Sequence, residues 1–316
     1  MKKNWINILK GIAIIFIILG HSPISKHFIP YAYSFDLPVF YFIAGYLFNN
    51  IKYENIKLFF KTRVLKILKP YLIFSLISIV LYCLIFQTNI FNLYTLEKLI
   101  LAKRSDIFYN IPLWFLPSFF VTQSIYYFLR RYIKKDNLVL IVCLILSFIG
   151  LVYFKTLKEP KLFWTIDASI YYLLFFAIGN LFRKYKEKIY FLLKNKLWFI
   201  LALIINMVPL FSNIYSKIWF TNSEIYYYFI TVFLALNGIF TVICIAKYLE
   251  HNKLLTYIGN NSLVYFAMHV PVFFLIKRIN DLIGINPVNS YLTGFTYLII
   301  TLLILTPFNK YLKRLI

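Results

Sequence analysis

Two ionisable side chains, Lys10 and His21, lie in the first long apolar stretch of the sequence. Such groups are costly inside a bilayer, so each is a candidate for function. A helix of about 3.6 residues per turn would place both on one face, about 16 Å apart along its axis. An imidazole, with a pKa of ~6.5, can accept a proton near neutral pH. The plain alternatives are a snorkelling lysine and a hydrogen-bonded histidine at a helix end, which Gly20 and Pro23 mark.

The elements that would hold these side chains are apolar helices. Residues 138–154 carry no charge, could cross ~30 Å of hydrocarbon as a helix, and lack the alternation of a barrel strand. We therefore expect an all-α polytopic transmembrane bundle of about ten helices, forming one domain over residues 1–316. The expected spans are residues 5–22, 35–50, 70–88, 112–129, 138–154, 166–182, 197–212, 224–246, 260–276 and 291–308.

The composition points to a membrane protein rather than a nucleic-acid-binding one. Hydrophobic residues make up 61% of the chain and charged residues 14%, against ~25% charged in soluble domains. The formal net charge of +23 would suggest nucleic acid in a soluble protein. Here it fits cytoplasmic loops that face anionic lipid, so we expect membrane lipid as a partner and no nucleic acid.

The distribution of basic residues predicts the orientation. With the N-terminus in the cytoplasm, the inner segments hold 23 Lys and Arg residues and the outer loops hold 10. This asymmetry predicts that both termini are cytoplasmic. The outer segment 89–111 carries three basic residues, which a surface helix there would accommodate.

The N-terminus and the cysteines indicate no processing and no metal. The basic start and apolar middle resemble a signal peptide, but no A-x-A-like site follows, so we expect a retained first span. Cys83, Cys143 and Cys244 lie inside apolar spans without CxxC spacing. We therefore expect neither a metal site nor a disulfide framework.

Five short blocks follow one another along the chain. They are KGIAII (10–15) through GHS (20–22), LPVFYFIAGYLF (37–48), RVLKILKPY (63–71), LWFLP (113–117), and IGNNSL (258–263) through HVP (269–271). Together they resemble the acyltransferase 3 family of membrane acyltransferases, whose first span has a basic residue, ten residues and then a histidine. The resemblance covers essentially the whole chain and is nearest to members that O-acetylate surface polysaccharides. Asp36, Ala44 and Lys66 depart from the common His, Ser and Arg of such members.

The resemblance implies transfer of an acyl group from cytoplasmic acyl-CoA to a hydroxyl of a cell-surface or lipid-linked glycan. It places the protein in the cytoplasmic membrane of a bacterium, with acetyl-CoA as co-substrate, a glycan as acceptor and no metal. Succinyl is an alternative to acetyl, and the acceptor sugar and oligomeric state stay open. A flippase of a lipid-linked sugar commonly shows internal repeats, and the sequence has none. A flippase and a structural subunit would both leave Lys10 and His21 unexplained.

The resemblance also suggests residues for the donor. Acyl-CoA carries several phosphates, and we expect Arg63, Lys66 and Lys69 to contact them where a basic loop enters a helix, with Lys10. Ordinary positive-inside charge explains any single lysine there. Lys66 cannot grip a phosphate through two parallel bonds as an arginine can.

His21 is the expected general base that takes the proton of the acceptor hydroxyl. A covalent acyl-histidine, or an acyl-serine on Ser22, is the alternative. Asp36 could orient His21 or simply cap a helix, and two other acidic residues that begin spans on the outer side, Asp167 and Glu224, are further candidates for orienting it.

His269 and Trp114 are the expected substrate-binding residues. His269 matches a family position inside the ninth span and contacts the acceptor or acyl group, or else satisfies a buried polar contact. Trp114 and Tyr46 could stack on a sugar or on adenine, although packing or an interfacial belt explains aromatic residues better in a chain this rich in them.

Overall fold

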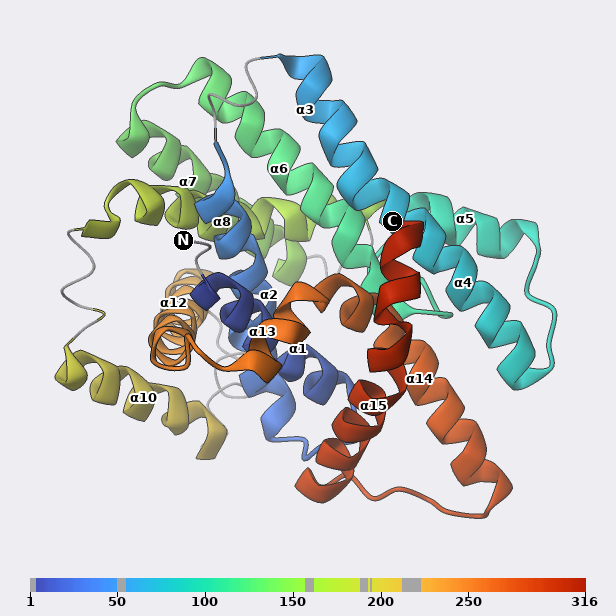
Figure 1. The fold of residues 1–316 in the computed structure, drawn as a ribbon. Helices are drawn as coiled ribbons and strands as arrows, with labels where there is room; N and C mark the ends of the chain where they lie inside the picture. The colour runs from blue at the N-terminus through green and yellow to red at the C-terminus, as the bar shows by residue number, and fades with distance from the viewer. Residues whose placement is uncertain (1–3, 50–54, 157–161, 188–192, 194, 212–222) are drawn as a thin grey trace. The chain divides into compact units, whose positions relative to one another are not determined.

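The structure is a computed structural model that describes residues 4–49, 55–156, 162–187, 193, 195–211 and 223–316. Every regular element in these ranges is a helix, as the sequence predicts (Figure 1). The helices are α1 (Asn4–His21), α2 (Phe28–Leu47), α3 (Ile56–Arg63), α4 (Lys69–Phe86), α5 (Leu93–Leu101), α6 (Phe115–Tyr132), α7 (Asp136–Thr156), α8 (Ile166–Lys184), α10 (Lys196–Phe211), α12 (Glu224–Tyr248), α13 (Lys253–Asn260), α14 (Ser262–Leu282) and α15 (Tyr291–Leu315). Short segments of other helix types are Val64–Leu68, Ile111–Trp114 and Phe163–Thr165.

Within the described ranges, seven helical segments are long and apolar enough to cross a membrane. They are Asn4–His21, Ile56–Phe86, Asp136–Tyr153, Phe163–Lys184, Glu224–Tyr248, Ser262–Leu282 and Tyr291–Leu315. Their large apolar side chains are often exposed, Leu84 at 69% and Leu303 at 70%. Extensive apolar surface of this kind is costly in water and suits contact with lipid, so the protein is a multi-pass membrane protein.

The other three predicted spans are helical but less apolar or shorter. Asp36 and Pro38 interrupt the apolar run of α2, and α6 contains buried polar side chains such as Gln123. The described part of α10 has 16 residues. About ten spans and two cytoplasmic termini therefore stay predictions.

Two helices lie in segments that the sequence analysis left as inner loops. Asn55 caps the start of α3, where its Oδ1 accepts from the Lys57 N–H at 2.8 Å, and Asn252 caps the start of α13, where its Oδ1 accepts from the Leu255 N–H at 2.8 Å. Asparagine is among the strongest N-caps, which is why helices start at these points. Because α3 runs on through a π-helical turn into α4, the helical segment that corresponds to the span expected at 70–88 begins well before Pro70, at Ile56. The helix expected within residues 89–111 is present as α5.

The contacts divide the chain into two compact units, each built from separate stretches of sequence. The first unit contains residues 1–48, 175–262 and 289–298. The second contains residues 49–174, 263–288 and 299–316. Of the predicted site residues, Lys10, His21 and Asp36 belong to the first unit, and the others belong to the second.

In the first unit, α1 crosses α13 at two glycines. A Cβ atom on Gly259 would lie 1.6 Å from the carbonyl oxygen of Asn7. A Cβ atom on Gly11 would lie 2.4 Å from that of Leu255. The two backbones are therefore in direct contact, as small residues allow between membrane helices. This crossing joins the first and last sequence blocks.

The same device joins α2 to the second half of α8, also in the first unit. A Cβ atom on Gly45 would lie 1.8 Å from the carbonyl oxygen of Phe176, and one on Gly179 would lie 2.0 Å from that of Phe42. Gly45 belongs to the second sequence block. Several motif glycines are thus required by helix packing.

Candidate functional site

His21 is the last residue of α1 in the first unit. Its Nδ1 lies 2.9 Å from the carbonyl oxygen of Ile17, one turn earlier. Because a carbonyl only accepts hydrogen bonds, Nδ1 carries the proton of the neutral ring and the lone pair is on Nε2. The hydroxyl of Ser22 donates to the carbonyl of Leu19 at 2.7 Å. Nε2 of His21 therefore carries the lone pair, whereas the Ser22 hydroxyl bonds a carbonyl at the helix end.

Tyr33 of α2 lies against the end of α1. Its ring centroid is 5.5 Å from that of His21, and its hydroxyl donates to the carbonyl of Gly20 at 2.9 Å. A Cβ atom on Gly20 would lie 2.7 Å from the Tyr33 ring. Glycine before the histidine therefore lets Tyr33 approach the end of α1 and contact the His21 ring.

Asp36 is 2% exposed and lies well inside α2, which begins at Phe28. The alternative that Asp36 caps this helix is therefore wrong, because the helix starts two turns earlier than the sequence analysis placed it. Its Oδ1 accepts from the N–H of Leu37 at 2.5 Å. Lys10 is half-buried on α1, three turns before His21. The catalytic role of Asp36 and the donor-binding role of Lys10 stay predictions.

In the second unit, Arg63, Lys66 and Lys69 lie on one continuous helix instead of a loop. Arg63 ends α3, Lys66 is in the π-helical turn Val64–Leu68, and Lys69 begins α4. The Lys69 N–H bonds to the carbonyl of Val64, five residues back, and this wider turn changes the spacing expected for a plain α-helix.

The Arg63 side chain lies over a packed aromatic pair. Its guanidinium carbon is 5.5 Å from the ring centroid of Phe59. Phe59 is fully buried and stacks on Tyr127 of α6, with centroids 4.1 Å apart. This support restricts Arg63, whereas Lys66 and Lys69 are exposed. Arg63 is thus the least exposed of the three cations and lies over an aromatic ring.

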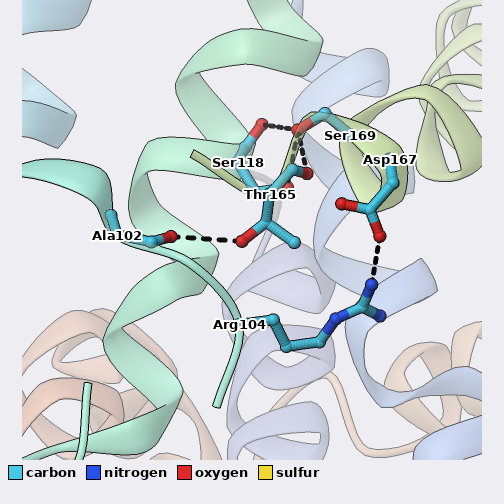
Figure 2. Close-up of polar contacts among 6 residues, drawn as sticks. All are labelled: Ala102, Arg104, Ser118, Thr165, Asp167 and Ser169. Carbon is cyan, nitrogen blue, oxygen red and sulfur yellow. Dashed lines mark hydrogen bonds and ion pairs between the residues drawn. The ribbon is translucent and has the colours of Figure 1, made fainter. Parts of the chain in front are cut away.

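A buried ion pair joins Arg104 to Asp167 at the start of α8 (Figure 2). The Asp167 side chain is fully buried, and the Arg104 side chain is 24% exposed. The guanidinium carbon of Arg104 also lies 5.6 Å from the ring centroid of Trp114, which is itself buried. Arg104 therefore contacts both Trp114, a predicted substrate-binding residue, and Asp167. The cationic partner of Asp167 is thus Arg104.

Hydroxyl groups and strained backbone surround this ion pair. The Ser169 hydroxyl lies 2.9 Å from that of Ser118, and the Thr165 hydroxyl donates to the carbonyl of Ala102 at 3.1 Å (Figure 2). Ala102, Trp164 and Thr165 all have positive φ angles, from 44° to 51°. Left-handed conformations of non-glycine residues cost energy and tend to occur at functional sites.

His269 is fully buried in α14. Its Nδ1 lies 2.7 Å from the carbonyl oxygen of Phe266, and its ring centroid lies 5.5 Å from that of Phe273. As for His21, the contact with a carbonyl assigns the proton to Nδ1 and the lone pair to Nε2. Contact of His269 with a substrate stays a prediction.

Asn110, four residues before Trp114 in the chain, bonds α14 near a proline. Its Nδ2 donates to the carbonyl of Ala267 at 2.7 Å and to the hydroxyl of Ser78 at 2.8 Å. Pro271 has no N–H for that Ala267 carbonyl, so Asn110 replaces the missing helical donor. The neighbouring Tyr109 is fully buried, and burial raises the pKa of its phenol to about 12, so the hydroxyl stays protonated at neutral pH.

Comparison with known proteins decides the family. The model of the acyltransferase domain that defines the acyltransferase 3 family matches residues 3–309, nearly the whole chain. The chain belongs to the acyltransferase 3 family. No curated protein and no solved structure matches it. The resemblance seen in the five sequence blocks is thereby confirmed, and membership supports acyltransferase activity in a membrane.

Three residues of this family member were not singled out from the sequence: Tyr33, Arg104 and Asn110. Tyr33 is one of 27 tyrosines, and nothing local distinguishes it. Arg104 gave a signal, because it is a basic residue in a loop predicted to lie outside, where positive charge is disfavoured. Asn110 precedes Pro112 and the LWFLP block, yet its partners are contributed by distant helices.

Proposed function

We propose that this acyltransferase 3 family protein transfers an acetyl group from cytoplasmic acetyl-CoA to a hydroxyl of a cell-surface or lipid-linked polysaccharide. It would act in the cytoplasmic membrane of a bacterium. Family membership and the apolar helices support a membrane acyltransferase. The observation that carries the proposal is His21, which ends an apolar helix with its Nδ1 proton held by Ile17 and its lone pair on Nε2.

In the proposed reaction, Nε2 of His21 removes the proton of the acceptor hydroxyl. The hydroxyl oxygen then attacks the thioester carbonyl, a carbon–oxygen bond forms, and the carbon–sulfur bond breaks. The CoA thiolate leaves and takes up the proton held on Nε2 of His21, which regenerates the neutral imidazole, so charge and atoms balance. A neutral imidazole suits proton removal near neutral pH, and Tyr33 would act as a positioning residue through its contact with the ring.

Arg63 is the proposed contact for a donor phosphate, with Lys66, Lys69 and Lys10 as weaker contributors. Its guanidinium can bind a phosphate through two parallel hydrogen bonds. The Phe59 ring beneath it supports a fixed orientation. Trp114 and His269 remain the proposed contacts for the acceptor or the acyl group, and Asp36 remains the proposed partner of His21.

The test is thiol release from acetyl-CoA by purified protein, with and without total cell-envelope glycan. His21→Ala is compared with His251→Ala, which removes a histidine whose side chain is 94% exposed. Both variants must match the wild type in yield and thermal stability. We expect release by wild type and His251→Ala and a loss of about 100-fold or more in His21→Ala, the usual scale for a general base.

Two outcomes would contradict parts of the proposal. Equal activity of His21→Ala would leave the reaction class intact and remove His21 as the base. No cleavage of acetyl-CoA or succinyl-CoA with any envelope fraction would remove the acyl transfer itself and favour transport of a lipid-linked sugar.

A further inference from the structure

A cavity of about 250 Å³ opens in the first unit between the start of α1, the ends of α2 and α8, and the last turn of α12. Its lining includes three aromatic and three charged side chains: Trp5, Tyr46, Phe182, Lys186, Glu187 and Lys247. The loop charges predict that this end of the unit faces the cytoplasm. None of these residues has a role in the proposed transfer step.

The rings of Trp5, Tyr46 and Phe182 are inclined to one another and form the aromatic wall of the cavity. The ring centroids of Trp5 and Tyr46 are 5.3 Å apart at 74°, and those of Tyr46 and Phe182 are 6.1 Å apart at 59°. Rings inclined in this way are not stacked on one another, so a flat heteroaromatic ring can pack against one of their faces.

Hydrogen bonds fix the end of α2, which contributes Tyr46. Nδ2 of Asn180 lies 3.2 Å from the carbonyls of both Gly45 and Phe48, and Nη1 of Arg183 donates to the Phe48 carbonyl at 3.1 Å. The last carbonyls of a helix have no helical donor, so these bonds hold α2 against α8 on either side of Phe182. The Tyr46 and Phe182 side of the aromatic wall is therefore preorganised, which lowers the entropy cost of binding.

The charged side chains favour an anion. Nζ of Lys247 lies 5.9 Å from the ring centroid of Trp5, and Lys186 lines the same cavity. Glu187 lies 3.6 Å from Lys186, but its side chain is 86% exposed, and exposed pairs of this kind are weak. Among the lining residues that the structure describes, two ammonium groups stand against one solvated carboxylate, which gives this part of the cavity a net positive charge.

We propose that this cavity binds the base and a phosphate of an adenine nucleotide, with Trp5 and Tyr46 against the base and Lys247 and Lys186 near the phosphate. Pockets that enclose whole drug-sized ligands have ~300–1,000 Å³, so this smaller cavity suits one base with a phosphate and not an entire acyl-CoA. A phospholipid headgroup would supply the phosphate but no ring. The inference rests on the proposed function in one respect: there, the nucleotide is the end of acetyl-CoA remote from the acyl group.

The test measures binding of CoA and of adenosine 3′,5′-bisphosphate to full-length protein in nanodiscs of zwitterionic lipid. We expect Trp5→Ala and Lys247→Gln each to raise Kd by about 5- to 100-fold, because one base stack or charged contact is worth that much. Trp5→Phe retains a ring and should stay within about threefold of wild type. The matched controls are Trp198→Ala and Lys253→Gln, exposed residues of the same unit that do not line the cavity.

The outcomes separate this site from the proposed reaction. Unchanged Kd values in Trp5→Ala and Lys247→Gln, with thiol release from acetyl-CoA intact, overturn the cavity assignment and leave the acyl transfer standing. Weakened nucleotide binding in a protein that cleaves no acyl-CoA supports the cavity and removes the reaction. If the variants instead lose co-purified anionic phospholipid at constant nucleotide affinity, the cavity is a headgroup site. Lys247→Gln decides the matter if Trp5→Ala does not fold.

Discussion

The side-chain amide of Asn110 donates a 2.7 Å hydrogen bond to the carbonyl of Ala267, the group that Pro271 leaves without a helical donor. Asn110 is fully buried and also donates to Ser78. Proline inside a membrane helix is tolerated when a neighbouring group satisfies the freed carbonyl, and here a residue far away in the sequence does so.

Asn110→Leu should lower the free energy of unfolding by about 1–3 kcal/mol, because the Ala267 carbonyl is left buried without its donor. Pro271→Ala restores a backbone N–H, so the same substitution should cost less in that background, by about 1 kcal/mol. Thermal unfolding in detergent of all four members of this cycle checks the coupling. Strictly additive effects would contradict it, and Asn260→Leu on an exposed position serves as control.

Arg104→Ala should destabilise the protein by about 3–5 kcal/mol, because the fully buried Asp167 carboxylate loses its cation. Adding Asp167→Asn to that variant removes the isolated charge and should restore part of the loss. The comparison is Glu97→Gln, which breaks a pair whose acidic side chain is 53% exposed and should cost under ~1 kcal/mol. Equal effects of Arg104→Ala and Glu97→Gln on thermal stability would show that the buried pair contributes no more to stability than the exposed pair.

Gly259→Ala should cost about 3 kcal/mol, because its Cβ would meet the backbone of Asn7, which cannot rotate away. Gly284→Ala is the matched glycine substitution. Its φ of 72° disfavours a side chain, but no atom lies within 4 Å of the new Cβ, so a cost of about 1–2 kcal/mol is expected. Chemical or thermal unfolding compares the two, and a smaller loss for Gly259→Ala would refute the direct backbone contact between α1 and α13.

Tyr33→Phe retains the ring beside His21 but loses the hydrogen bond to Gly20. We expect a stability loss of about 0.5–1.5 kcal/mol, together with a fall in kcat and little change in KM for acetyl-CoA. Gly20→Ala should lower kcat further, because the new Cβ pushes the Tyr33 ring away. Thiol-release kinetics measure both, with the exposed Tyr132→Phe as control. A KM effect without a kcat effect would argue against a positioning role.

The sequence by itself determined the helical class, the membrane setting and the family. These follow from properties that are local in the chain. Uninterrupted apolar runs such as residues 138–154 identify helices without reference to any other part of the chain. The order of the five sequence blocks indicated the family. The capping residues Asn55 and Asn252 are visible in the sequence. They lie in polar stretches without a long apolar run, so the helices α3 and α13 that follow them were not predicted.

Only the tertiary structure decided which side chains meet. Arg104 and Asp167 are 63 residues apart, and Asn110 and Ala267 are 157 apart. Hydrogen bonds and buried ion pairs act over a few ångströms, so such partnerships depend on how helices pack and leave no periodic signal in the chain. For the same reason Tyr33 could not be told from the other tyrosines until α2 was seen against the end of α1. The sequence identified His21 as a candidate catalytic residue, and the structure showed that Tyr33 lies beside it.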